Sequence, residues 1–170
     1  MIIDNDIQLQ QVILNDLNEI IDEVAGKLLK SLKKSIQKEV YDAGTPIVYE
    51  RQWDENPEKS FMESFETSTA VTMMGEFVEA WIEHDPMSMN LDELYNIHTT
   101  GGKDLRSILA DIIIAGRPPM PDQYYATNKY GFWTEPRDFW EPFMKELNKN
   151  GNKFIESAFR MRGIVYKKIS

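Results

Sequence analysis

The feature that most constrains the fold is a long helical periodicity in the first quarter of the chain. Apolar residues recur there at steps of three and four: Leu9, Ile13, Leu17, Ile20, Val24, Leu28, Leu32, Ile36 and Val40. That spacing places them on one face of a helix, so the sequence predicts one long amphipathic helix over residues 6–42. The Asp-Asn-Asp run at 4–6 suits its first turn, and Gly44 followed by Pro46 suits its end.

This helix is long for the size of the chain. The 170 residues fit a single domain, residues 1–170, with a core of its own. At a rise of 1.5 Å per residue the helix would span about 55 Å, which exceeds what a compact domain of this size needs. We therefore expect residues 1–44 to protrude as an arm, to break near Gly26, or to pack on another chain.

Residues 67–84 predict a β-hairpin. TSTAVTMM is rich in β-branched residues, Gly75-Glu76 suits a turn, and FVEAWIEH alternates with the period of a strand. The alternation places one set on each face of the second strand: Val78, Ala80 and Ile82 on one, and Phe77, Glu79, Trp81 and Glu83 on the other. The second face combines aromatic side chains with acids, which suits a surface partly covered by a partner.

The rest of the chain predicts more helix. Helical patterns cover residues 91–97, 104–115, 137–147 and 154–161; the last two are separated by the breaker run NKNGN, and the final IVYKKI has strand character. The order of elements predicts an α+β fold with a long N-terminal helix, a small antiparallel sheet with a β-hairpin, and C-terminal helices.

Charge is unevenly distributed. The net charge of −9 argues against a protein that wraps nucleic acid, because that binding neutralises phosphates. Residues 50–93 hold twelve acids and two bases, whereas residues 145–170 hold seven bases and two acids. We expect the basic end to meet the acidic hairpin, either within one chain or between neighbouring copies. No apolar run has the length of a membrane span, so no membrane is expected as a partner.

The residues that carry chemistry form no convincing catalytic set. The chain has no cysteine, which excludes disulfides, zinc–thiolate sites and cysteine nucleophiles. Its two histidines, His84 and His98, lack an evident ligand or nucleophile set, and TTGGK lacks the full spacing of a phosphate-binding loop. The sequence therefore predicts no catalytic residue, no metal and no cofactor. A small metal- or acid/base-dependent hydrolase using these histidines stays open as an alternative.

Two further segments suit binding to a partner. RPPMP, at 117–121, fits a rigid loop or a polyproline ligand, so a soluble adaptor that binds a partner through this loop is a second alternative. Residues 124–143 hold eight aromatic residues. These suit packing on the chain's own core, a protein interface, or stacking on single-stranded nucleic acid.

The stretch YERQWDENPEKSFMESF, Tyr49 to Phe65, suits contact better than chemistry. It sets an arginine between aromatic residues, follows it with polar and turn-forming residues, and ends on two phenylalanines. We expect a loop and a short helix held between the long helix and the hairpin, or across a subunit boundary.

Taken together, these motifs resemble the head–tail junction proteins of tailed bacteriophages, a family of minor structural proteins that act in the neck or complete the tail. The resemblance covers most of the chain: a long amphipathic helix, the tyrosine–arginine and serine-bearing element YERQWDENPEKSFMESFE, the histidine–glycine stretch IHTTGGKDLRSILADIIIAG, and the closing PRDFWEPFMKEL and FRMRGIVYKK. The chain departs from the commoner pattern at Gln52-Trp53, where a threonine–glycine is usual.

The resemblance implies a structural role without catalysis. It implies a ring-forming homo-oligomer in the virion, assembled in the host cytoplasm, that contacts neighbouring neck, portal-side or tail-tube proteins and meets DNA only as it passes through a channel. With the charge pattern and the aromatic segments it gives these candidate interface residues: Tyr49, Arg51, Trp53, Glu76, Glu79, Glu83, Tyr124, Tyr125, Phe132, Trp133, Arg160, Arg162, Lys167 and Lys168.

Overall fold

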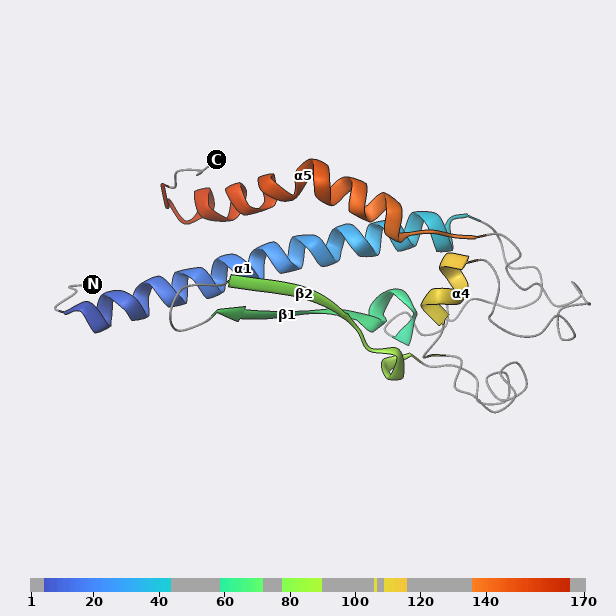
Figure 1. The fold of residues 1–170 in the computed structure, drawn as a ribbon, viewed down its shortest axis with the longest axis horizontal. Helices are drawn as coiled ribbons and strands as arrows, with labels where there is room; N and C mark the ends of the chain where they lie inside the picture. The colour runs from blue at the N-terminus through green and yellow to red at the C-terminus, as the bar shows by residue number, and fades with distance from the viewer. Residues whose placement is uncertain are drawn as a thin grey trace, which may run out of the picture. The chain divides into compact units, whose positions relative to one another are not determined.

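The protein has the predicted α+β fold. The computed structural model describes residues 5–43, 59–71, 78–89, 106, 109–115 and 136–165. Its elements, in chain order, are helix α1 (Asp6–Ile36) with a π-helical turn (Gln37–Tyr41), a 3-10 turn (Met62–Ser64), strands β1 (Phe65–Val71) and β2 (Val78–His84), a 3-10 turn (Pro86–Ser88), and helices α4 (Leu109–Ala115) and α5 (Trp140–Met161) (Figure 1). A long N-terminal helix, a small sheet and C-terminal helical structure are all present.

Helix α1 confirms the long periodic helix. Asn5 caps it, with its Oδ1 atom accepting a hydrogen bond from the Gln8 amide at 2.9 Å. The helix continues through Gly26 without a break. Its last turn carries Lys33 and Lys34, cations that suit the negative end of the helix dipole.

Strands β1 and β2 form a two-stranded antiparallel sheet, which confirms the predicted hairpin (Figure 1). The predicted faces of β2 are also observed: Ala80 and Ile82 are half-buried, whereas Glu79, Trp81 and Glu83 are exposed. Val78, at the start of the strand, is exposed as well. The expected turn at Gly75-Glu76 lies outside the described residues.

Helix α5 corrects the prediction of two helices separated at NKNGN. It is one continuous helix of 22 residues. Asn150, inside the supposed break, donates from Nδ2 to Glu146 Oε1 at 2.8 Å, so its side chain is satisfied within the helix. Tertiary burial of one face, with Ala158 fully buried, outweighs the helix-propensity cost of about 1 kcal/mol for Gly151.

The other helical predictions are met in part. Helix α4 is described over Leu109–Ala115, inside the predicted range 104–115, and residues 104, 105, 107 and 108 lie outside the described part. The predicted strand at the end of the chain is not observed at Ile164 and Val165, and its remaining residues lie outside the described part, as does the predicted helix over 91–97.

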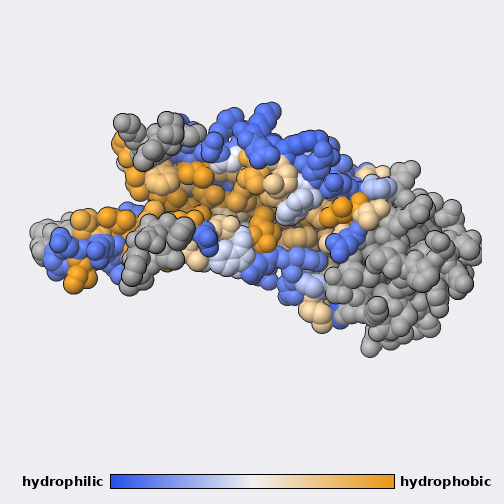
Figure 2. All heavy atoms as spheres, in the orientation of Figure 1, coloured by the Kyte–Doolittle hydropathy of each residue, from blue (hydrophilic) through white to orange (hydrophobic). Residues whose placement is uncertain are grey.

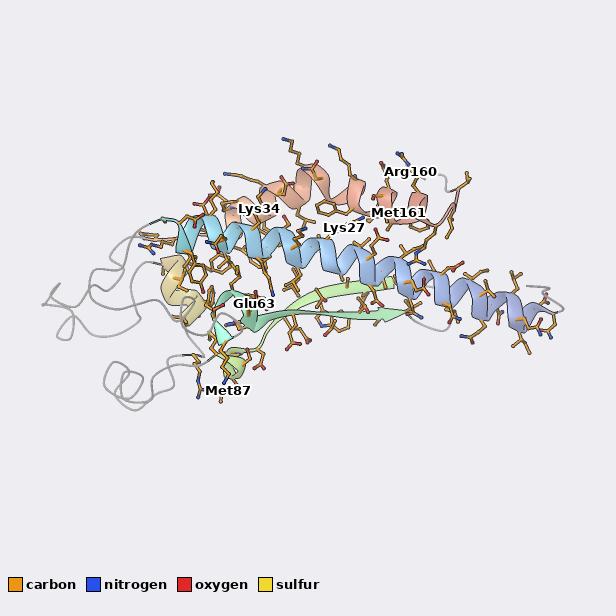
Figure 3. All side chains as sticks on the ribbon, turned by 180° about the vertical axis from the view of Figure 1, so that it is seen from behind. Lys27, Lys34, Glu63, Met87, Arg160 and Met161 are labelled. Atoms are coloured by element: carbon orange, nitrogen blue, oxygen red, sulfur yellow. The ribbon has the colours of Figure 1, made fainter. Side chains whose placement is uncertain are left out.

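The chain divides into two compact units, and the first comprises Met1–Ser31, Thr67–Glu83 and Lys145–Ser170. Within this unit, α1 lies between α5 and the hairpin (Figures 1 and 3). Ile20 and Val24 of α1 pack with Ala158 of α5, and the partly buried Leu28, Phe159 and Ile164 surround them. On the other side of α1, Thr69 of β1 donates from its hydroxyl to Asp22 at 2.6 Å.

The second unit comprises Leu32–Glu66 and His84–Met144. Its described core is apolar and includes four phenylalanines: Leu32, Ile36, Val40, Phe61, Met62, Phe65, Met89, Ile113, Phe139 and Phe143. The hydroxyl of Ser35 donates to the carbonyl of Phe139 at 2.6 Å, and Lys33 forms an ion pair with Glu63. The prediction of a single domain stays a prediction.

Candidate subunit-interface surfaces

The short helix expected between Tyr49 and Phe65 is present in the second unit at Met62–Ser64. Phe61 and Phe65 flank it and are both buried, and their rings meet edge to face with centroids 5.2 Å apart. Ser64 is also buried, and its hydroxyl donates to the carbonyl of Phe61 at 2.6 Å. The described end of the stretch therefore forms core. Tyr49, Arg51 and Trp53 lie outside the described residues.

His84 belongs to the same core. Its ring stacks on that of Phe65, with centroids 4.6 Å apart and planes 19° from parallel, and meets the edge of Phe61 at 5.6 Å. Its Nε2 atom is buried without a hydrogen-bond partner among the described residues. Burial lowers the pKa of His84, and the nearby Asp85 carboxylate opposes that shift. The environment is that of a packing residue.

The described part of the aromatic segment at 124–143 is its end, residues 136–143. Phe139 and Phe143 are buried in the second unit, which confirms packing on the chain's own core for these two residues. Trp140 is 43% exposed. The candidate interface residues of this segment, Tyr124, Tyr125, Phe132 and Trp133, lie outside the described residues, as do Arg117 to Pro121.

The acidic hairpin face, defined as Glu79, Trp81 and Glu83, is one of three charged and apolar surfaces on the first unit. Glu83 is occupied within the chain: its carboxylate accepts from Trp81 Nε1 at 2.6 Å and from Ser68 Oγ at 2.9 Å. These two donors lower the pKa of Glu83 by stabilising the charged form. Glu79 has no ion-pair partner among the described residues. Glu76, the third acid of this prediction, lies outside them.

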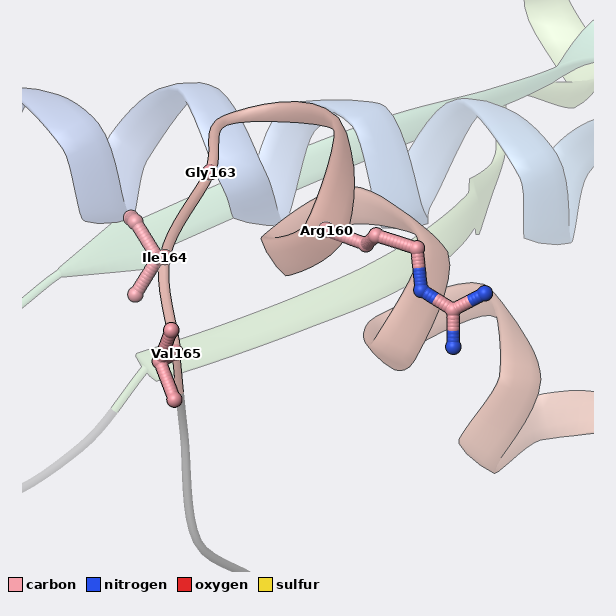
Figure 4. A pocket seen from close by; sticks show the side chains of 4 residues that line it. All are labelled: Arg160, Gly163, Ile164 and Val165. Atoms are coloured by element: carbon pink, nitrogen blue, oxygen red, sulfur yellow. The ribbon is translucent and has the colours of Figure 1, made fainter.

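The C-terminal patch, defined as Arg160, Met161 and Val165, is the second surface. Met161 is 72% and Val165 97% exposed. A shallow hollow of about 400 Å³ lies here, lined by Arg160, Gly163, Ile164 and Val165 (Figure 4). Arg160 has no partner among the described residues, whereas Arg162 forms an ion pair with Glu19 of α1. The predicted partners Lys167 and Lys168 lie outside the described residues.

Charge neutralisation of the hairpin by the C-terminal end within one chain is not observed where the structure can test it. Among the described hairpin acids, Glu83 accepts from a hydroxyl and an indole donor, and the C-terminal Arg162 pairs with Glu19 of α1. Sequence reasoning could not foresee the Arg162–Glu19 pair, because it joins residues 143 positions apart.

The arm stripe, defined as Asp6, Leu9, Ile13 and Asp16, is the third surface, and the sequence pattern did not single it out. Leu9 and Ile13 are 43% and 49% exposed, although they continue the helix face on which Ile20 and Val24 are buried. Figure 2 shows hydrophobic and hydrophilic residues side by side on this part of α1. Periodicity identifies the face of a helix, but it gives no information on how far a neighbouring element covers it.

Comparison with known proteins identifies the family of the chain. The family model YomN matches residues 5–161, which is nearly the whole chain. The chain belongs to the YomN family. The family carries the name of a phage-derived protein from a Bacillus phage region, and this makes the chain a phage-associated protein. No curated protein matches the chain, and no solved structure does.

Two features of the described residues bear on other kinds of function. No three histidine, aspartate or glutamate side chains gather there as a metal ion would require. No helix in that part of the chain combines the length and the apolar character needed to cross a bilayer.

Proposed function

We propose that this chain is a structural virion protein of a tailed phage, a ring-forming subunit that joins head to tail or completes the tail. The observation that carries the proposal is the group of uncovered apolar side chains on the first unit. Leu9, Ile13, Met161 and Val165 are large, apolar and at least 43% exposed, and charged side chains lie beside them. Surfaces of this composition are typical of proteins that are completed by neighbouring subunits.

Family membership supports the phage part of the proposal, and the resemblance at the sequence level supports the neck. The described fold is consistent with both, since a long helix beside a hairpin and a C-terminal helix offers extended surfaces to neighbours. Under this proposal the chain is no enzyme. His84 serves packing, because its ring contacts two phenylalanines and its buried Nε2 atom has no hydrogen-bond partner among the described residues.

Genetic removal tests the proposal in the phage itself. The gene is inactivated in a phage or prophage that encodes this chain, and the particles are counted and imaged by electron microscopy. We expect filled heads and tails that are not joined into infectious particles, and restoration by a plasmid copy of the wild-type gene. An antibody against the chain, coupled to gold, should label the junction in complemented particles.

The same experiment can refute the proposal. Normal infectious particles in the absence of the protein would exclude an essential neck role. Purified virions that do not bind the antibody, when it recognises the protein in infected cells, would exclude a virion component and favour an adaptor that acts during infection.

A further inference from the structure

The arm stripe continues the buried face of α1, but its apolar side chains are exposed. Ile20 and Val24 are 4% and 6% exposed where α5 packs on them, whereas Leu9 and Ile13, earlier on the same face, are 43% and 49% exposed. The four positions follow at steps of four, seven and four residues, which keeps them on one side of the helix. In the first unit, the start of α1 extends past the described residues of α5 and of the hairpin (Figures 1 and 3).

The charge of the arm stripe argues against packing on the arm stripe of a second copy. Asp6 and Asp16 lie three residues before Leu9 and three residues after Ile13, so an acid stands at each end of the apolar pair. Residues 1–26 contain six acids and no base. Two such stripes packed face to face would bring like charges together, which opposes association. The cover must be apolar and basic.

The C-terminal patch has this composition. Gly163 ends α5 with φ +68°, and its amide donates to the carbonyl of Arg160 at 3.0 Å. The turn directs Ile164 into the core of the first unit and leaves Val165 exposed beside the last helical turn. Arg160 supplies a cation that has no partner among the described residues, and the sequence adds Lys167 and Lys168 shortly after Val165.

We infer that the arm stripe of one copy packs on the C-terminal patch of a second copy of this chain. Leu9 and Ile13 would then lie against Met161 and Val165, with Asp6 or Asp16 close to Arg160 of the neighbour. The inference rests on the proposed function, because it requires several copies in one assembly. The contact joins two different surfaces, and repetition of such a contact closes into a ring when the rotation between neighbours allows it.

The acidic hairpin face is a weaker candidate for the same cation. Glu83 already accepts two hydrogen bonds within its own chain, and Trp81 donates one of them. Only Glu79 of that face is left without a partner among the described residues. The arm stripe offers two acids that have no partner among the described residues, and two exposed aliphatic side chains.

Cross-linking between single-cysteine variants tests the contact, because the natural chain has no cysteine. Ile13→Cys and Met161→Cys chains with different tags are expressed together in the host of the inactivated phage, and particles and free protein are treated with a short bis-maleimide. We expect a covalent dimer that carries both tags. A contact in the assembly raises the local thiol concentration to about millimolar, so this dimer should form roughly 100-fold faster than one made by random collision.

The matched control replaces Met161→Cys by Met87→Cys, since Met87 is similarly exposed, at 63%, and belongs to the second unit. Cross-linking at the control rate would overturn the inference, and so would a dimer of two Ile13→Cys chains that exceeds the mixed dimer. If either occurs in particles with a normal neck, the proposed function stands and only the contact is wrong. Failure of the proposed function is recognised separately, by absence of the protein from virions.

Discussion

At the scale of single residues, His84 shows how this chain uses a titratable group as core. The imidazole contacts the rings of both Phe61 and Phe65, and the ring of Phe139 meets both phenylalanines edge to face. A charged imidazolium would lose hydration there without gaining an acceptor among the described residues. The packing is therefore best with the ring neutral.

We predict that acid destabilises the protein partly through His84. Its pKa is lower in the folded chain than in the unfolded chain, where it is about 6.5, so the unfolded chain takes up the proton first. The contribution is fully present above that value and is lost as the pH falls below it. Urea unfolding at pH 7.5 and 5.5 measures the effect. His84→Phe should lose less stability between these two pH values than the wild type, and an equal loss would contradict the prediction.

The hydroxyl of Ser35 is the basis of a second prediction at this scale. Ser35 of α1 donates to the carbonyl of Phe139, just before α5, at 2.6 Å. Ser35→Ala should lower the free energy of unfolding by about 0.5–1.5 kcal/mol, because it removes a partly buried hydrogen bond. Ser31→Ala, one turn earlier on the same helix, is the matched control and should change it by less than about 0.5 kcal/mol. Similar losses in both variants would indicate a general helix effect instead.

At the scale of secondary-structure elements, two glycines occupy opposite situations. Gly26 lies in the interior of α1 and is exposed, and a Cβ atom there would meet nothing within 4 Å. Gly163 also has open space, but its φ of +68° is a conformation that favours glycine. Space alone therefore does not decide the effect of a substitution.

We predict opposite effects of alanine at these two positions. Gly26→Ala should stabilise the protein by about 0.5–1 kcal/mol, through higher helix propensity and a less flexible unfolded chain. Gly163→Ala should destabilise it by about 1 kcal/mol, because the Cβ atom of alanine is strained in a left-handed backbone conformation. Thermal unfolding of the two variants beside the wild type is the measurement. A gain at both positions would mean that α5 can end without the left-handed residue.

The elements that could be predicted from sequence are those with a long, unbroken period. The apolar face runs through the whole of α1, and the two faces of β2 differ in burial from Glu79 onward, so both elements were predicted with their faces. The break in α5 was predicted wrongly because local propensity at NKNGN was weighed without the burial of Ala158. The residue types also predicted that the acids of β2 lie on its exposed face. The pairing of Arg162 with Glu19 and the exposure of the start of α1 depend on tertiary structure, so the sequence could not predict them.

At the scale of the whole molecule, the net charge of −9 bears on DNA. A subunit that lets DNA pass should not hold it, since phosphate binding requires cations in excess of acids. We predict no measurable binding of duplex DNA by the purified protein at about 150 mM salt, as monitored by fluorescence anisotropy. Binding that weakens steeply with added salt would show that the basic end of the chain contacts DNA. It would contradict the prediction that the protein does not bind DNA that passes through the channel.

The same charge asymmetry predicts which acidic surface meets the basic end in an assembly. Arg160→Glu should weaken association between copies and leave folding nearly unchanged, because the side chain is exposed and has no partner among the described residues. An exposed ion pair contributes about 0–1 kcal/mol, so the Kd of each contact should rise by up to roughly five-fold. Lys149→Glu, which makes the same charge change elsewhere on α5, is the control and should associate normally.

Second-site reversal then identifies the partner of Arg160. Adding Asp16→Lys to Arg160→Glu restores opposite charges across the proposed contact, so association, measured by native mass spectrometry at physiological salt, should partly recover. Adding Glu79→Lys should not restore it, although the net charge of the two double variants is the same. Recovery with Glu79→Lys alone would place the acidic hairpin face at the contact. The arm stripe would then pack on a different surface, because repulsion between its two acids and those of a second arm stripe would still prevent the two stripes from pairing.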